Sequence, residues 1–239
     1  MKKLLKTLLP ESVYRPILWH WRRYLINRGC LRRLQPFSRA FGVDRGLSID
    51  RHYIEGFLHE HRALIRGRTL EIGDDAYTKR FGGNQVLSAE VLHAVEGNPQ
   101  ATLVGDLSTG RGLACETFDC IVLTQALHVI YDVQGALKNV HSLLRPGGAV
   151  LATAPGISQI SRYDMDRWGD YWRFTTASAA RIFCDVFGKE NVTVRSHGNV
   201  MAAVAFLHGL AAQELTQEEL IFHDPDYELL ITVVATRCE

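Results

Sequence analysis

The chain has 239 residues, of which 46% are hydrophobic, and this predicts one main domain with a sizeable core and an appendage. No apolar run approaches the about 20 residues that a membrane-spanning helix needs. The net charge of +1 hides an asymmetry, because residues 1–45 carry eleven Lys and Arg against two acidic residues, a net of +9. A basic arm on an acidic body indicates that the arm meets an anionic surface, either a membrane leaflet or a nucleic acid.

The first 30 residues predict two basic amphipathic helices. One interpretation is an interfacial helix on an anionic membrane, and the other is a helical lid or dimer contact whose arginines are solvated. The start resembles a signal peptide, but Lys6 interrupts its apolar stretch and no small-residue cleavage site follows, so we do not expect secretion. Five cysteines without a C-x-x-C pair predict free thiols in a reducing cytoplasm.

The stretch RGLSIDRHYIEGFLHEHRALI, residues 45–65, predicts a helix that closes over a ligand site, with Arg51 and Tyr53 near its mouth. His59 and His61 flank Glu60 in this stretch, but side chains two positions apart on a helix point in different directions, and no third ligand is apparent. We therefore expect no metal site. Residues 1–67 are predicted to form a basic helical arm and lid, and residues 68–239 the main domain.

From residue 68 onward, β-rich and helical segments alternate, which predicts an α/β fold with a mostly parallel sheet covered by helices on both faces. A helix should begin after Asp132 as its N-cap, and another should occupy 176–187 before Gly188. The expected strands are 68–73, 101–106, 118–124, 148–155, 191–196 and 228–237.

The loop after the first of these strands reads LEIGDDAYT, from Leu70 to Thr78. A dinucleotide site needs G-x-G-x-x-G, because the pyrophosphate must approach backbone N–H groups at a helix N-terminus. This loop lacks the second glycine and carries two aspartates, which would repel a pyrophosphate. The composition of the loop instead suits a ligand with a cationic end.

These segments together resemble the class I S-adenosylmethionine-dependent methyltransferases, specifically the type 11 group, over residues 68–239. The resemblance rests on TLEIGDDAY, LVGDLS, FDCIVLTQALHVIYD and LLRPGGAVLATAP. YDMDRWGDYWRFT is also similar to a segment of members associated with sugar and polysaccharide modification. The resemblance implies a Rossmann-like fold with a seven-stranded sheet and S-adenosyl-L-methionine as the cofactor.

The resemblance also implies roles for individual residues. Gly73 would let the backbone approach the methionine part of the cofactor, and Asp106 would accept a hydrogen bond from the adenine amine. A carboxylate at the end of the second strand would bind the ribose, with Glu90 as the first choice and Glu96 as the alternative. The remaining cofactor residues would be Glu71 and Asp74 at the ammonium, Asp75 and Tyr77 in the loop where the motif departs from the family, Leu107 beside the adenine, and Gln125 at the pocket floor.

Methyl transfer to a hydroxyl needs alignment and removal of a proton. His128 is the candidate base, with a packing or hydrogen-bonded histidine as the alternative, and Asp164 is a second catalytic candidate. Aromatic faces can pack against sugar rings while charged side chains bind hydroxyls, so the segment after the fifth strand suits a glycan or small-molecule acceptor. The acceptor residues would be Tyr163, Asp164, Asp166 and Trp168, whereas Phe174 is expected in the core.

Three functions follow from this interpretation. The first is O-methylation of a sugar, glycolipid or related small molecule by a cytoplasmic enzyme, with residues 1–30 as a membrane contact. The second is a non-catalytic module that keeps the fold and docks a biosynthetic complex on a membrane. The third, methylation of RNA, is disfavoured because the body of the chain is acidic.

Overall fold

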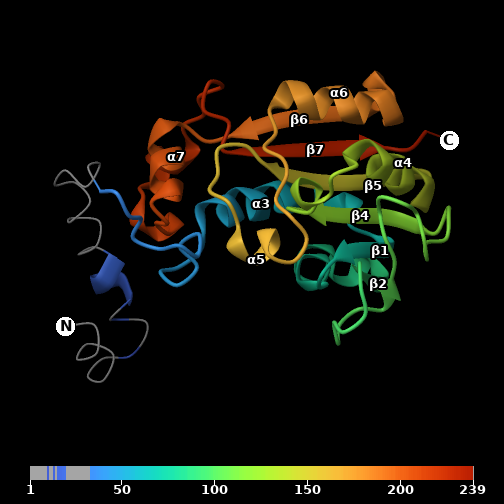
Figure 1. Cartoon of the computed structure of the whole chain (residues 1–239), viewed down its shortest axis with the longest axis horizontal. Helices are drawn as coiled ribbons and strands as arrows, with labels where there is room; N and C mark the ends of the chain where they lie inside the picture. Colours follow the sequence, from blue (N-terminus) through green and yellow to red (C-terminus); the bar gives the residue numbers. More distant parts are fainter. Residues whose placement is uncertain (1–9, 11–12, 14, 20–32, 239) are drawn as a thin grey trace.

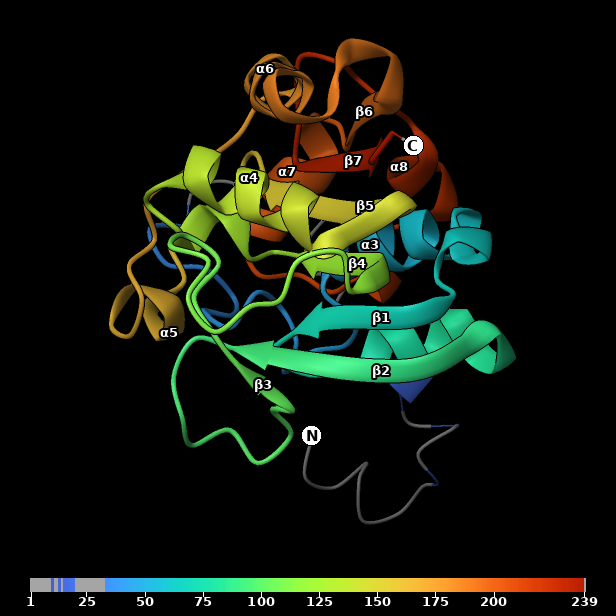
Figure 2. The same ribbon diagram turned by 90° about the vertical axis from the view of Figure 1, so that its right-hand side faces the viewer.

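The computed structural model describes residues 10, 13, 15–19 and 33–238. In this part of the chain one seven-stranded sheet has the order β3-β2-β1-β4-β5-β7-β6, which Figure 2 shows from β3 at the bottom to β6 at the top. Strands β1 to β5 run parallel, and β7 is antiparallel to both of its neighbours. The strands are β1 (Gly67–Ile72), β2 (Val86–His93), β3 (Leu103–Val104), β4 (Phe118–Thr124), β5 (Leu144–Pro155), β6 (Val192–His197) and β7 (Leu230–Thr236).

The helices cover both faces of the sheet, as the alternation of the sequence predicts. Side chains alternate across each strand, so Ile121 and Leu123 of β4 face one hydrophobic cluster while Cys120 and Val122 face the other. The first cluster also contains α4 and α6, and the second contains α3, α7 and α8 (Figure 2). The helices are α3 (Ile49–Glu60), α4 (Val133–Leu143), α5 (Arg162–Met165), α6 (Thr176–Phe187), α7 (Val200–Leu207) and α8 (Gln217–Ile221).

The expected helix starts are confirmed by their caps. The side chain of Asp132 accepts from Gly135 N at the start of α4, and Thr175 with Ser178 forms a capping box at the start of α6. Gly188 ends α6 with φ +84°, a conformation that favours glycine. Phe174 is buried in the core as predicted.

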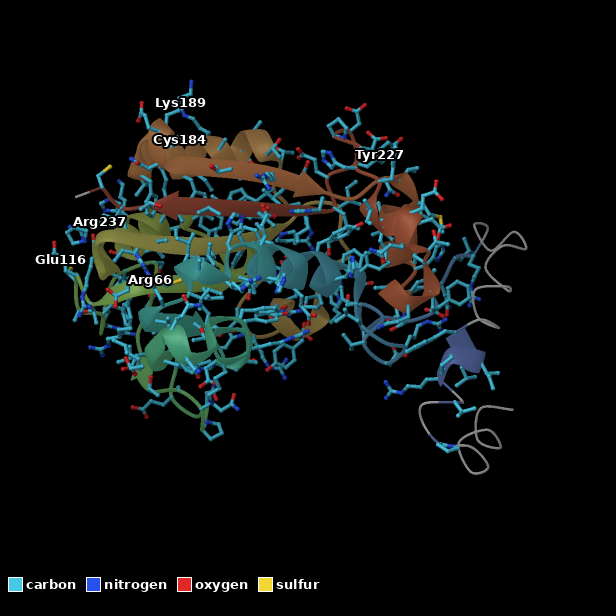
Figure 3. All side chains as sticks on the ribbon, turned by 180° about the vertical axis from the view of Figure 1, so that it is seen from behind. Arg66, Glu116, Cys184, Lys189, Tyr227 and Arg237 are labelled. Carbon is cyan, nitrogen blue, oxygen red and sulfur yellow. The ribbon has the colours of Figure 1, made fainter. Side chains whose placement is uncertain are left out.

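Hydrogen bonds fix the end of the last strand to neighbouring segments. Tyr227 precedes β7 and Arg237 follows it, and the two lie at opposite ends of the molecule in Figure 3. Arg237 Nη2 donates to Glu116 Oε1 at 2.7 Å, and its Nη1 donates to the Leu144 carbonyl at 2.6 Å. These bonds fix the end of β7 to the segments that enter β4 and β5.

Helix α3 packs its apolar face into the core, and the expectation that it closes over a ligand stays a prediction. Ile49, Ile54, Phe57 and Leu58 are buried, and α3 shares its cluster with residues of β4 and β5. Tyr53 is also buried, and its hydroxyl donates to the Leu220 carbonyl at 2.9 Å rather than standing at a pocket mouth. The domain boundary placed at residue 67 stays a prediction.

The predictions for the first 30 residues lie almost entirely outside the described residues. Trp19, which is described, donates from Nε1 to the Arg45 carbonyl at 3.3 Å. No helix among the described residues is long and apolar enough to cross a membrane.

A buried ion pair joins the segment before α3 to the segment between α7 and α8. Arg45 Nε donates to Glu214 Oε2 at 2.9 Å, and the same carboxylate accepts from Ala211 N at 2.9 Å. We expect Glu214→Ala to lower the free energy of unfolding by about 3–5 kcal/mol, because the substitution leaves a buried guanidinium without this carboxylate. Urea denaturation measures the change.

A matched control is Glu60→Ala, which removes the partner of Arg195 from an ion pair whose side chains are 57% and 53% exposed. Its effect should stay within about 1 kcal/mol. Similar losses in the two variants would contradict a structural role for the buried pair.

Candidate functional site

A cavity of about 1220 Å³ lies at the carboxyl ends of the parallel strands. Its wall includes Gly73 after β1, His93 at the end of β2, Gln125 after β4 and Pro155 at the end of β5. Ligands of open α/β sheets bind at this edge, where the strand order reverses. Small-molecule pockets measure about 300–1,000 Å³, so this cavity has room for more than one small molecule.

Gly73 shapes the wall beside β1. Its φ of +86° favours glycine, and a Cβ placed on it would meet nothing within 4 Å, so the backbone is open on that side. Its N–H donates to the Leu92 carbonyl at 3.0 Å, and its carbonyl accepts from Asn98 Nδ2 at 2.7 Å. The turn is therefore fixed to the end of β2 and to the following loop.

Glu71 lines the cavity and also holds the loop. The residue is only 2% exposed, and its two oxygens accept from Tyr77 N at 3.2 Å and Thr78 N at 2.7 Å. Burial raises the pKa of the Glu71 carboxyl to about 7, although these backbone hydrogen bonds oppose the shift. The geometry makes Glu71 a positioning residue for the loop, and its expected contact with the ammonium stays a prediction.

The two aspartates of the loop point to different surroundings. Asp74 lies in the cavity wall, and its Oδ1 accepts from Ala76 N at 2.9 Å. Asp75 does not line the cavity, because its carboxylate pairs with Lys79 Nζ at 2.7 Å, one helical turn further on. The expectation that Asp75 contacts the cofactor is therefore wrong for this conformation of the loop.

Tyr77 and Arg51 meet in the cavity wall. Arg51 Nη1 donates to the Tyr77 hydroxyl at 2.9 Å, with the guanidinium carbon 5.7 Å from the centre of the tyrosine ring. Burial raises the pKa of Tyr77, so its hydroxyl keeps its proton at neutral pH. Arg51 thus lies at the site as expected, although Tyr53 does not.

A helical crossover follows this loop. It begins at Ala76 and continues through a π-helical turn, Thr78–Gly82, and a 3-10 turn, Gly83–Gln85. At its start the Lys79 N–H donates to the Asp75 carbonyl at 3.0 Å. The exclusion of a dinucleotide therefore rests on the sequence of the loop.

Asp106 and Leu107 line the cavity where the chain leaves β3. Asp106 Oδ1 accepts from Ser108 N at 2.8 Å and from Ser108 Oγ at 2.7 Å, and Oδ2 accepts from Thr109 Oγ1 at 3.0 Å. The Ser108 side-chain hydrogen bond is the main reason that the pKa of Asp106 is lowered, so this group is a carboxylate at neutral pH. Leu107 is buried, and its carbonyl accepts from Asn139 Nδ2 at 2.7 Å.

The choice of Glu90 as the strand-end carboxylate is wrong. Glu90 pairs with Leu70 in mid-strand, three residues before β2 ends at His93. Its carboxylate accepts from Arg68 Nη2 at 3.1 Å and from Thr102 Oγ1 at 2.6 Å, and it does not line the cavity. Glu96, the alternative, is exposed and is also outside the cavity wall, so neither carboxylate reaches the site.

Gln125 and His128 follow β4 at the centre of the cavity wall. Gln125 has φ +49°, an uncommon conformation for a residue other than glycine, and its N–H donates to the Thr153 carbonyl at 3.0 Å. His128 is 6% exposed, and its Nδ1 has no hydrogen-bond partner among the described residues. Burial lowers the pKa of His128, while Asp170 and Asp164 oppose the shift, so the ring is neutral at pH 7.

The segment around α5 covers another side of the cavity. Tyr163, Asp164 and Trp168 line it, whereas Asp166 is exposed and lies outside the wall, against the expectation for an acceptor residue. The backbone N–H of Tyr171 donates to the His128 carbonyl at 2.8 Å and joins this segment to the end of β4.

Asp170 and Arg173 hold the same segment in shape. Arg173 Nη2 donates to Asp170 Oδ2 at 3.0 Å, and Ser161 N donates to the same oxygen at 2.9 Å. The Asp170 side chain has no exposed surface in this pair. The pair therefore fixes both ends of the α5 segment against each other.

The sequence interpretation missed His93 and Asn98, which also line the cavity. His93 Nδ1 lies 2.7 Å from the Val95 carbonyl, and its ring makes an edge contact with Trp168 at 5.5 Å. A prediction that placed the end of the second strand three residues after Glu90 would have pointed to His93. The turn sequence GNPQ would have pointed to Asn98. The described residues contain no group of three His, Cys, Asp or Glu side chains that could hold a metal ion.

The fold is that of the S-adenosylmethionine-dependent methyltransferases. Similar solved structures include the N-methyltransferase NodS from Bradyrhizobium japonicum WM9 in complex with S-adenosyl-L-homocysteine, which is 15% identical with a TM-score of 0.52 over 87% of this chain and 95% of that one. A 1,6-didemethyltoxoflavin-N1-methyltransferase from Burkholderia thailandensis is 16% identical with a TM-score of 0.51, over 97% of this chain and 92% of that one. At these identities the likeness concerns the fold alone.

A family model described as a methyltransferase domain matches residues 30–193, more than half of the chain, and the protein belongs to this family. "Probable polyketide synthase 10" from Dictyostelium discoideum is 27% identical over 74 residues, or 31% of this chain. "Lovastatin diketide synthase mokB" from Monascus pilosus is 31% identical over 77 residues, or 32% of this chain. The match spans only 3% of the length of each of these curated relatives. The type 11 assignment and the association with sugars stay predictions.

The raised pKa of Glu71 predicts a pH dependence of stability. The folded state binds the proton of Glu71 more tightly than the unfolded chain does. The contribution of Glu71 to the free energy of unfolding is therefore fully present below pH 4.5, the ordinary pKa of this group, and is lost as the pH rises through about 7. Between about pH 5 and about pH 8 the loss should be about 2–3 kcal/mol. Glu71→Gln cannot ionise and should lack this part of the slope. Urea unfolding of both proteins at the two pH values measures it, and parallel profiles would contradict the assignment.

Proposed function

We propose that this protein uses S-adenosylmethionine as a methyl donor and transfers the methyl group to an oxygen of a sugar, a glycolipid or a related small acceptor. The observation that carries the proposal is the pair of carboxylates, Asp74 and Asp106, in the cavity wall of a chain that belongs to a methyltransferase domain family. Asp74 directly follows the open glycine turn at Gly73, and Asp106 follows β3. This wall suits a ligand that carries a cationic group at one end and an adenine ring at the other.

The residues present fit this cofactor. Asp74 would hold the ammonium through a charge-assisted hydrogen bond, and Asp106 would accept from the adenine amine beside Leu107. Asp75, which replaces the usual second glycine, has no positive φ and lies outside the cavity wall, so it does not block the approach of a ligand. When bound, S-adenosylmethionine supplies an activated methyl group on a sulfonium.

The volume of the cavity supports a separate acceptor beside the cofactor. Tyr163 and Trp168 present aromatic surface to it, and Asp164 adds a carboxylate that can accept from hydroxyl groups. Such a mixture suits a sugar ring, whose C–H face packs on aromatics and whose edge carries hydroxyls. The side chains of Asp170 and Arg173 would keep this wall in place rather than touch the acceptor.

His128 would take the proton from the acceptor hydroxyl. Burial keeps its imidazole neutral, which is the form that accepts a proton, and the residue lies in the cavity wall between Gln125 and the α5 segment. No carboxylate orients the ring through Nδ1, since that atom has no hydrogen-bond partner among the described residues. The proposal therefore gives His128 a direct role as base and Asp164 a role in orienting the acceptor.

Two measurements test the proposal as a whole. Calorimetry with the full chain should detect binding of S-adenosylmethionine and S-adenosylhomocysteine. Incubation with radiolabelled cofactor and a panel of sugars, nucleotide sugars and glycolipids should then yield an O-methylated product. Absence of cofactor binding by the folded chain would favour the non-catalytic module, and transfer only to carbon, nitrogen or RNA would overturn the sugar assignment.

Asp106→Ala should weaken binding of S-adenosylhomocysteine by about 1.5–3 kcal/mol, because it removes a charged acceptor for the adenine amine. The substitution also removes the hydrogen bonds that shape the Asp106 turn, so Ser108→Ala serves as the matched control. This control removes one of the turn's bonds and keeps the carboxylate. An equal loss of affinity in both variants would show that loop order, and not adenine recognition, is responsible.

His128→Gln should lower kcat for the acceptor found in the panel by about 10²-fold or more, with the affinity for S-adenosylhomocysteine unchanged. In the wild type, the acid limb of the kcat profile should lie below pH 6.5, the ordinary value for histidine, since the lowered pKa keeps the base neutral at lower pH. A stability loss without a change in kcat would indicate that His128 only packs. Rates measured across pH with both proteins distinguish the two roles.

A further inference from the structure

Three aromatic side chains form an exposed cluster beside the cavity. Tyr131, between β4 and α4, is 71% exposed, and Tyr171 and Trp172, between α5 and α6, are 49% and 39% exposed. The centre of the Tyr131 ring lies 5.4 Å from that of Tyr171 and 5.8 Å from that of Trp172. We call these three residues the aromatic platform. Adjacent apolar rings that face water are typical of a binding surface.

Backbone hydrogen bonds attach the aromatic platform to the turn that carries His128. The His128 carbonyl accepts from Tyr171 N at 2.8 Å and from Trp172 N at 3.3 Å. The indole Nε1 of Trp172 donates to the carbonyls of Ile130 at 3.1 Å and Tyr131 at 3.3 Å. These bonds fix the indole against the backbone of the same turn. A side chain that is already held in place loses little conformational freedom when a ligand binds to it.

The aromatic platform continues the cavity wall toward the outside. Tyr131 and Tyr171 line the cavity, whereas Trp172 lies outside its wall. Tyr131 follows the candidate base His128 by only three residues, so the platform lies beside the site of the proposed reaction. A ligand that is longer than one sugar unit would therefore extend from the cavity onto the platform.

The chemistry of the aromatic platform suits a sugar ring. The C–H face of a sugar packs on aromatic rings, and a phenol hydroxyl both donates to and accepts from sugar hydroxyls. The hydroxyls of Tyr131 and Tyr171 form no hydrogen bond within the described part of the chain. The platform contains no cation, which a nucleic-acid backbone would need. Three side chains are also far less than the about 800 Å² that each partner buries in a stable protein interface.

We propose that the acceptor is an oligosaccharide, free or as the glycan of a glycolipid, and that the aromatic platform binds the sugar unit next to the one that is methylated. The inference rests on the proposed function and adds the length of the acceptor to it. The unit that is methylated lies in the cavity beside His128 and Asp164, and its neighbour packs on the platform. The platform does not touch the reacting atoms, and it selects longer acceptors over monosaccharides.

The experiment measures how affinity depends on the length of the saccharide. The probes are methyl glycosides of glucose, galactose and mannose with one, two or three units, titrated by saturation-transfer NMR into the full chain with S-adenosylhomocysteine present. In at least one series the disaccharide should bind the wild type about 5–10-fold more tightly than the monosaccharide. Tyr131→Ala should remove most of this preference. Tyr131→Phe, which keeps the ring and loses only the hydroxyl, should retain most of it.

Tyr227→Ala is the matched control. Tyr227 is also an exposed tyrosine, at 38%, but it lies outside the cavity wall, so its removal should leave the preference for the longer saccharide unchanged. Equal affinities of the wild type for one and two units, or an unchanged preference in Tyr131→Ala, would overturn the inference and leave a monosaccharide acceptor. Failure of the wild type to bind S-adenosylhomocysteine, or any of the saccharides, would overturn the proposed function as well, so the two failures are distinguishable.

Discussion

The candidate site depends on the buried carboxylate of Glu71, which accepts from the backbone N–H groups of Tyr77 and Thr78. These two N–H groups belong to the first turn of the helical segment that begins at Ala76, where backbone donors have no partner within the helix, so the carboxylate satisfies them. The two bonds close the loop over its own strand and bring Asp74 and Tyr77 to the cavity wall. Through Tyr77 the same loop holds the guanidinium of Arg51 from α3, and one buried group therefore sets the positions of several others.

The fold could be predicted closely because its signals are local and repeated. Strand β4 and helix α6 occupy the residues expected from the apolar run FDCIVLT and from the spacing of Ala179 and Phe183 before Gly188. The cavity wall was predictable where a residue closely follows a strand, as with Gly73 and Asp106. Such positions reach the same edge of a parallel sheet whatever the loops do.

The errors arise where a residue's surroundings depend on distant parts of the chain. Glu90 was placed at a strand end, but Val91 and Leu92 are buried and continue β2 to His93, which leaves Glu90 to pair with Arg68 from β1. Asp75 lies next to Asp74 in sequence, yet the turn that follows directs it to Lys79.

The charges of the cavity wall differ from what the net negative charge of the body of the chain indicates. The net charge of the sequence treats the body as uniformly negative. Most acidic groups near the site already have partners, however: Glu71 accepts from backbone N–H groups, Asp75 pairs with Lys79, and Asp170 pairs with Arg173. The cavity wall keeps other charged groups, among them the carboxylates of Asp74 and Asp106 and the guanidinium of Arg51. Such a local balance can favour a small zwitterion, whereas an RNA backbone, which carries only negative charge, would require a continuous basic surface around the cavity. The charges that face the cavity therefore follow from which groups the fold pairs rather than from the net charge of the chain.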